Sequence, residues 1–287
     1  MLPAWIDRQE YPFSPRKFTL PAGEMSYLDE GQGEPLLMIH GNPSWSFEFR
    51  HLIKSLSPHC RCLAPDHIGF GLSDKPRHWE YLPQQHADNL EVWLEALDVE
   101  EITMIFGDWG GPLGLSYAIR HPDRVKQIVI TNTWMWSVRD DWYYQAFSRF
   151  VGGSIGRWLI RRYNFFASTI LKATFGDREK LTPEIHQHYL KPFSNPQERT
   201  GTHVFPRQII GSSEWLQSLW EQRDALSSKV KLIVWGMKDI AFREKELNRW
   251  CKAFPAAKVV RFPSAGHFLA EELPRQLTAE LKDLLGI

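Results

Sequence analysis

Short apolar runs alternate with stretches of helical periodicity over the first 133 residues. Residues 17–31 predict a short antiparallel hairpin. Apolar runs that end at glycine or turn residues predict buried strands, and apolar positions repeating at three and four predict helices. The predicted strands lie within residues 34–41, 60–74, 101–107 and 124–133, and the predicted helices within residues 44–56, 82–99 and 110–122. Strands separated by helices of this length form βαβ units, so we predict an α/β fold with a doubly wound, mostly parallel sheet.

This regular order stops after residue 133 and returns near the C-terminus. Residues 134–216 contain no strand-like run, and their hydrophobic pattern is helical or irregular. Two further strands are predicted within residues 230–239 and 257–267, and two further helices within residues 245–254 and 273–285. The length of 287 residues suits one α/β core that carries an insertion. We therefore expect a core domain of residues 1–133 and 217–287, and a helical cap domain of residues 134–216 inserted between two core strands.

Polar and glycine-rich loops follow the predicted strands. In open α/β sheets, ligands bind beyond the carboxyl ends of the strands. The loops at these ends contain residues 40–43, residues 66–71, residues 108–111, Asn132, Asp239 and His267. We expect the functional site among them.

Asp108 stands at the head of a helix, directly after a predicted strand. The order strand, Gly107, Asp108, Trp109, Gly110 and helix resembles the nucleophile elbow of the α/β hydrolases, with Asp108 where many of them have serine. Phe106 departs from the strict pattern, which has a small residue two positions before the nucleophile. In this fold an acid and a histidine follow the nucleophile along the chain, and Asp239 and His267 complete that order.

An aspartate nucleophile is ionised at neutral pH, so it attacks a saturated carbon without a base and forms an alkyl ester. His267 would then activate a water that hydrolyses the ester, with Asp239 orienting the imidazole ring. The indole N–H of Trp109 is a donor without a competing acceptor, and the Asn42 amide can point to the same place, which suits a leaving halide. The backbone N–H groups of Asn42 and Trp109 are candidates for the oxyanion hole.

Charge and composition exclude several classes of partner. Lys plus Arg and Asp plus Glu number 34 each, the net charge is zero, and no run of five like charges occurs. Neither nucleic acid nor an anionic membrane is therefore an expected partner. Charges within the first ten residues and the lack of a membrane-length apolar stretch predict a cytoplasmic protein. Cys60, Cys62 and Cys251 lack metal-ligand spacing and are interpreted as reduced thiols, and no metal site is expected.

Five motifs, HGNPSW, DHIGFGLSDKP, GDWGGPLGL, WGMKD and AGHF, resemble those of the haloalkane dehalogenases, from about residue 25 to the C-terminus. Because Asn132 follows the sixth core strand and Asp239 the seventh, the chain is similar to the subfamily with an Asp-His-Asp triad, here Asp108, His267 and Asp239. In that subfamily one Asn and one Trp bind the halide, and the resemblance implies that Asn42 and Trp109 do so here. The resemblance implies hydrolysis of a small halogenated alkane by water to an alcohol, a halide and a proton, with no cofactor.

The resemblance also implies an apolar pocket. Aromatic residues are abundant, with 13 Trp and 17 Phe, and could line it. The residues that the resemblance places in its walls are Trp134, Phe147, Phe150, Phe205, Pro206 and Phe268.

Three other functions stay open. An epoxide hydrolase uses the same aspartate elbow and needs cap tyrosines to protonate the opening oxygen, and the predicted cap contains Tyr143, Tyr144, Tyr163 and Tyr189. Asn42 argues against it, because epoxide hydrolases usually carry an aromatic residue there. A cofactor-free oxygenase of the luciferase type has a similar scaffold. An inactive ligand-binding protein could lose its nucleophile, acid or base, yet all three are present.

Overall fold

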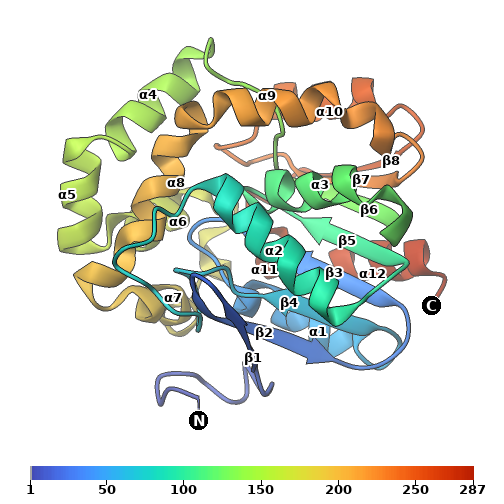
Figure 1. Ribbon diagram of the computed structural model, residues 1–287, viewed down its shortest axis with the longest axis horizontal. Helices are drawn as coiled ribbons and strands as arrows, with labels where there is room; N and C mark the ends of the chain where they lie inside the picture. The colour runs from blue at the N-terminus through green and yellow to red at the C-terminus, as the bar shows by residue number, and fades with distance from the viewer. Residues whose placement is uncertain (1) are drawn as a thin grey trace.

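The computed structural model describes residues 2–287, in which eight strands form one sheet with helices on both faces (Figure 1). The strands are β1 (Arg16–Leu20), β2 (Gly23–Glu30), β3 (Pro35–Ile39), β4 (Arg61–Pro65), β5 (Ile102–Phe106), β6 (Val125–Thr131), β7 (Val230–Gly236) and β8 (Lys258–Phe262). Their order is β1-β2-β4-β3-β5-β6-β7-β8. β2 pairs antiparallel with β1 and β4, and the other neighbours pair parallel. The predicted hairpin and the mostly parallel α/β sheet are confirmed.

Twelve α-helices lie within the described residues. They are α1 (Arg50–Leu56), α2 (Pro83–Leu97), α3 (Gly110–Arg120), α4 (Trp142–Val151), α5 (Ser154–Tyr163), α6 (Leu171–Thr174), α7 (Pro183–Leu190), α8 (Thr200–Gly211), α9 (Ser213–Glu221), α10 (Glu244–Ala253), α11 (Leu269–Glu272) and α12 (Pro274–Leu285). Shorter helical turns are η1 (Ser46–Phe49), η2 (Pro122–Arg124), η3 (Phe166–Ile170), η4 (Arg178–Lys180), η5 (Lys191–Phe193), η6 (Pro196–Arg199) and η7 (Arg223–Leu226). None of the helices within residues 2–287 is long and apolar enough to cross a membrane.

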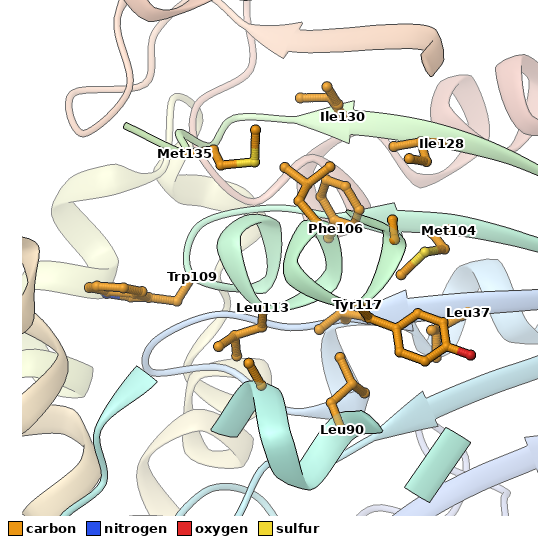
Figure 2. Close-up of a cluster of buried hydrophobic side chains, with 14 of the residues drawn as sticks. Leu37, Leu90, Met104, Phe106, Trp109, Leu113, Tyr117, Ile128, Ile130 and Met135 are labelled. Atoms are coloured by element: carbon orange, nitrogen blue, oxygen red, sulfur yellow. The ribbon is translucent and has the colours of Figure 1, made fainter. Parts of the chain in front are cut away.

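The sheet separates two hydrophobic cores, because successive side chains of a strand point to opposite faces. On β3, Leu37 packs into the core that contains the inner faces of α2 and α3, whereas Leu36 and Met38 pack into the core that contains α1 and α12. Figure 2 shows the first core, with Leu113 and Tyr117 of α3 on the side of that helix that faces Leu90 of α2. Trp109 lies at the end of this cluster, where α3 begins. The packing therefore holds the N-terminus of α3 against the carboxyl end of the sheet.

The segment between β6 and β7 carries α4 to α9 and no strand among the described residues, as predicted for the cap. Local capping sets where its helices begin and end. Asp141 accepts from the Tyr143 N–H at 3.0 Å at the start of α4, and Asn164, with a φ of 53°, ends α5. The expected domain boundary at residues 216 and 217 falls inside α9, so the division into core and cap remains a prediction.

Candidate active site

Asp108 lies on the sharp turn between β5 and α3. Its φ of 48° is a left-handed conformation that residues other than glycine rarely adopt. The Asp108 N–H donates to the Asn132 carbonyl at 2.9 Å, and Thr133 Oγ1 donates to the Asp108 carbonyl at 2.5 Å. These hydrogen bonds to the loop after β6 stabilise the strained turn.

Two glycines let this turn lie close to its neighbours. A Cβ atom at Gly41 would lie 2.3 Å from Asp108 Oδ1, and one at Gly114 would lie 2.9 Å from the Phe106 ring. The missing side chain at Gly114 makes room for Phe106. The departure of Phe106 from the strict elbow pattern is therefore accommodated on α3, and the turn is kept.

The Asp108 carboxylate is buried among hydrogen-bond donors. The Asn42 N–H donates to Asp108 Oδ1 at 2.7 Å. Burial raises the pKa of Asp108, whereas the positive charge of His267 and the backbone N–H groups of Asn42 and Trp109 lower it. Because both N–H groups point at the carboxylate, they can stabilise negative charge that develops on its oxygen.

His267 lies between the two aspartates. Its Nδ1 atom is 2.8 Å from Asp239 Oδ2, and its Nε2 atom is 3.9 Å from Asp108 Oδ2. Burial lowers the pKa of His267, but the charges of Asp239 and Asp108 outweigh burial and raise it to about 9. The structure therefore brings the three predicted triad residues together in the order Asp108, His267, Asp239.

Asn132 binds the same carboxylate from the other side. Its Nδ2 atom donates to Asp239 Oδ2 at 2.8 Å, and its Oδ1 atom accepts from the Gly236 N–H at 2.8 Å. The Ala241 N–H donates to Asp239 Oδ1 at 2.7 Å. These bonds fix Asp239 so that one of its oxygens faces His267.

Glu272 fixes the histidine loop. Its carboxylate accepts from the Gly266 N–H at 3.0 Å and from the N–H groups of Gly176 and Asp177 at 2.9 Å each. Next to it, the His267 N–H donates to the Thr174 carbonyl at 2.9 Å. Glu272 therefore ties the loop after β8 to the segment after α6. The sequence analysis did not single out Glu272, because the partners that define it are distant in the chain.

An apolar cavity of about 120 Å³ opens above Asp108. Its lining residues are Asn42, Asp108, Trp109, Trp134, Tyr143, Tyr144, Phe147, Phe166, Ile170, Thr174, Pro206, Ile209, Ile240, Ala241 and Phe242. Both proposed halide ligands border it. The Trp134 Nε1 atom is buried without a partner among the described residues, so this wall also carries an unpaired donor.

The structure places the six predicted pocket residues at different positions relative to the cavity. Trp134, Phe147 and Pro206 line the cavity. Phe205 is buried behind it, with its ring centroid 5.1 Å from that of Trp109, and Phe268 lines a separate small cavity beside His267.

The assignment of Phe150 to the pocket is wrong. Its side chain is 51% exposed. α4 buries Tyr144, Ser148 and Val151, and this spacing of four and three defines its inner face. Phe150 lies on the outer side of the same helix, a distinction that counting aromatic residues could not make.

The hydroxyl groups of the four cap tyrosines are not seen to donate hydrogen bonds into the cavity. Tyr143 donates to the Ile240 carbonyl at 2.7 Å, and Tyr144 donates to the Ala241 carbonyl at 2.9 Å. Tyr189 binds Glu271, and Tyr163 is 55% exposed. The hydroxyl groups of Tyr143, Tyr144 and Tyr189 thus all have hydrogen-bond partners within the chain.

Glu48 is a second site residue that the sequence analysis missed. It lies on η1 and lines the small cavity that also touches Asp108 and His267. The only signal in the sequence is an acidic residue within the aromatic run Trp45–Phe49. A partly exposed cluster of Glu91, Glu95 and His121, with ligand atoms within 4.8 Å of one another, lies outside both cavities.

The chain is similar to known proteins along most of its length. The family described as alpha/beta hydrolase fold matches residues 34–274. The chain is 36% identical to haloalkane dehalogenase 2 of Mycobacterium tuberculosis, over 98% of each chain. It is 32% identical to cis-3-alkyl-4-alkyloxetan-2-one decarboxylase of Shewanella oneidensis, over 96% of this chain and 89% of that protein. The crystal structure of haloalkane dehalogenase DbeA from Bradyrhizobium elkani superimposes with a TM-score of 0.86 at 22% identity, covering 96% of this chain and 98% of that one, and shares the fold.

Proposed function

The chain belongs to the alpha/beta hydrolase family and, within it, to the haloalkane dehalogenases, and we propose that it hydrolyses small haloalkanes to an alcohol, a halide and a proton through an alkyl ester of Asp108. The observation that carries this proposal is the opening of the Asp108 carboxylate onto an apolar cavity bordered by Asn42 and Trp109. A substrate of carbon and halogen offers little except apolar surface to recognise.

In the first step, Asp108 Oδ attacks the carbon that carries the halogen. The new carbon–oxygen bond forms as the carbon–halogen bond breaks, and the electron pair leaves with the halide. The buried carboxylate reacts without a base, and the side-chain N–H groups of Asn42 and Trp109 bind the leaving anion.

The first step also changes the charge around His267. Burial lowers the pKa of His267, and Asp239 and Asp108 together raise it to about 9 while both are ionised. Once Asp108 is a neutral ester, one of these two charges is gone and the pKa of His267 falls. His267 is therefore released to act as a base when the ester is ready for hydrolysis. His267 takes a proton from a water molecule, and the oxygen of that water attacks the Asp108 carbonyl carbon. The backbone N–H groups of Asn42 and Trp109 stabilise the oxyanion that forms.

The second candidate function is decarboxylation of a dialkyl-oxetanone, favoured by the 32% identity to the Shewanella oneidensis protein. The cavity size argues for the first candidate. An apolar cavity of about 150 Å³ is known to hold one benzene molecule. A cavity of about 120 Å³ suits a haloalkane of a few carbons better than a ring that carries two alkyl chains.

A parallel assay distinguishes the two functions. Purified protein is given 1,2-dibromoethane, 1-bromobutane or 1-iodobutane, and halide and proton release are measured. In parallel it is given a cis-3,4-dialkyl-oxetan-2-one, and alkene and carbon dioxide are measured. We expect halide release. Alkene formation without halide release would favour the decarboxylase, and the absence of both products would favour a ligand-binding protein. The cytoplasmic location remains a prediction.

Loss of either halide ligand should slow the first step. We expect Trp109→Leu and Asn42→Ala each to slow carbon–halogen cleavage by about a hundredfold or more, since each removes one donor to developing negative charge. Stopped-flow measurement of the first turnover checks this rate. Quenching of tryptophan fluorescence by bromide or iodide should also weaken in Asn42→Ala. An unchanged halide affinity in both variants would place the leaving-group site elsewhere.

The acid that orients His267 can be tested by moving it. Asp239→Asn should slow ester hydrolysis by up to about ten-thousandfold, as the loss of the carboxylate beside a catalytic histidine does in a serine protease. Because Asn132 already binds the oxygen that faces His267, the double variant Asp239→Asn with Asn132→Asp should recover part of the turnover. Full activity of Asp239→Asn alone would refute the role of Asp239.

A further inference from the structure

A small cavity with both polar and apolar lining lies between η1, the nucleophile and the histidine. Its volume is about 20 Å³. The polar part of its lining consists of Asn42, Ser44, Glu48, Asp108 and His267. A buried water needs about 10–15 Å³ and two to four polar partners, so this cavity has the size and lining for one water molecule.

The carboxyl group of Glu48 has an unusual environment there. Burial raises the pKa of Glu48 to about 7, while a hydrogen bond from Ser44 and the charge of His267 act in the opposite direction. Glu271 and Asp108 are the other charged groups that face it, and both raise the pKa further. Glu271 is bound by Arg50 and Tyr189, whereas Glu48 has no ion-pair partner within residues 2–287. Glu48 can therefore gain and lose a proton near neutral pH.

Resting on the proposed function, we propose that Glu48 holds the hydrolytic water and removes the proton that the reaction produces. The water gives one proton to His267 Nε2 and keeps its second proton hydrogen-bonded to the Glu48 carboxylate. Its oxygen bonds to the Asp108 carbonyl carbon, and the tetrahedral intermediate expels the alkoxide, which takes the proton from His267 and leaves as the alcohol. The carboxylic acid left on Asp108 passes its proton to Glu48, which releases it to solvent.

The isosteric variant Glu48→Gln tests this role step by step. With a bromoalkane, we expect the first-turnover bromide release to stay within about twofold of the unchanged enzyme, and ester hydrolysis to slow at least about tenfold. Alkyl-enzyme should then accumulate by intact mass. In the unchanged enzyme, ester hydrolysis should rise with pH through a transition near pH 7, where Glu48 ionises. This transition should vanish in Glu48→Gln and persist in Glu48→Asp.

The outcomes separate this proposal from the proposed function. If the unchanged enzyme releases no halide, the proposed function fails. If it forms the alkyl ester and Glu48→Gln hydrolyses that ester at the same rate with the same pH profile, only the role of Glu48 is refuted. Equal slowing of both steps would show a merely structural role and would also refute it. Glu34→Gln, which changes an exposed glutamate paired with Lys126, is the matched control.

A second inference comes from the outer surface of the cap. Residues 142–176 contain five basic residues and no Asp or Glu, although the overall composition predicts about four acidic residues in such a length. The basic residues are Arg149, Arg157, Arg161, Arg162 and Lys172, all exposed and without an ion pair within residues 2–287. The zero net charge of the chain therefore hides a basic segment, residues 142–176, within the cap.

Large apolar side chains lie among these cations on α4 and α5. The exposed side chains are Trp142 (75%), Ile155 (64%), Trp158 (57%), Tyr163 (55%) and Phe150 (51%). Figure 1 shows α4 and α5 at the outer edge of the molecule, away from the sheet. Trp158 packs edge-on against Tyr163, and the Arg162 guanidinium lies 5.3 Å from the Tyr163 ring centroid. Helices that lie in a lipid interface combine Lys and Arg on a polar face with Trp, Phe or Leu on an apolar face.

We infer that this basic and aromatic cap surface binds an anionic phospholipid bilayer, with arginines at the phosphates and Trp158, Ile155 and Phe150 among the acyl chains. The inner side of α4 carries Phe147, which lines the cavity above Asp108. Apolar substrates dissolved in the bilayer would thus meet the cap. A second copy of the chain is a poor occupant, because a two-fold contact would bring the same unpaired arginines together.

Vesicle sedimentation tests this surface. We expect binding to phosphatidylcholine vesicles that contain about 30% phosphatidylglycerol, loss of binding at about 0.5 M salt, and none to pure phosphatidylcholine. The triple variant of Arg157, Arg161 and Arg162 to Gln, and Trp158→Ser, should each bind at least about tenfold more weakly. A triple variant of the exposed Lys231, Lys238 and Lys252 to Gln, with the same charge change, should bind normally.

Either of two results would overturn this inference. One is no binding to the anionic vesicles at low salt. The other is a dimer in sedimentation velocity that Trp158→Ser dissociates, because the surface would then be covered by a second copy.

Discussion

Asp108→Ala should release no measurable halide, less than about one-thousandth of the rate of the unchanged enzyme. Asp108 is the only carboxylate that lines the apolar cavity within the described residues. Without it nothing attacks the carbon, and water alone displaces halide from a primary carbon very slowly. Halide release from purified protein, with 1-bromobutane and 1-iodobutane, is the measurement.

Folding can be checked separately. Burial raises the pKa of Asp108, so its ionised form lowers the free energy of unfolding at neutral pH. The alanine variant lacks this unfavourable contribution. We therefore expect the variant to keep its melting temperature near neutral pH. Asp108→Asn, which tolerates the left-handed backbone better, should be equally inactive in the first turnover. Asp224→Ala, at an exposed position, is the control. More than a trace of activity in Asp108→Ala would refute the role of Asp108.

His267→Gln should separate the two chemical steps. Attack by Asp108 needs no base, so the variant should release one halide per active site at close to the normal rate. Ester hydrolysis does need the base, so turnover should stop with Asp108 alkylated. We expect overall turnover to fall by at least about a thousandfold.

Intact-mass measurement after exposure to a bromoalkane decides this prediction. The expected result is one added alkyl group per chain, located by peptide mapping at Asp108. His59→Gln, at an exposed position, should show no added mass at steady state. A folded His267→Gln protein that releases its first halide and carries no alkyl group would contradict the covalent scheme.

The sequence predicted the triad because each of its residues lies in a loop that follows a strand. Asp108 follows β5 and Asp239 follows β7, and strands of a parallel sheet end at the same edge. The hydrophobic pattern is enough to find those strands, so the grouping of these residues needs no knowledge of distant contacts. Asn42, in the loop after β3, meets Asp108 for the same reason.

Residues positioned by helix rotation or by distant partners could not be predicted in this way. Phe147 and Phe150 are both aromatic residues of α4, and only the packing of that helix decides which one faces the cavity. In the sequence, Glu48 has the pattern of an ordinary polar residue on a helix. Its position beside His267 depends on how η1 packs against the loop after β8. Glu272 likewise gains its role from N–H groups of the cap and of the histidine loop.

The most direct test of the central claim is a single turnover in water enriched in ¹⁸O, with enzyme in excess over a bromoalkane. If Asp108 attacks the substrate and water attacks the Asp108 carbonyl, the first alcohol carries ¹⁶O from Asp108, and the peptide that contains Asp108 gains ¹⁸O. If the first alcohol carries ¹⁸O and the peptide does not, water attacks the substrate carbon directly and the covalent account is contradicted.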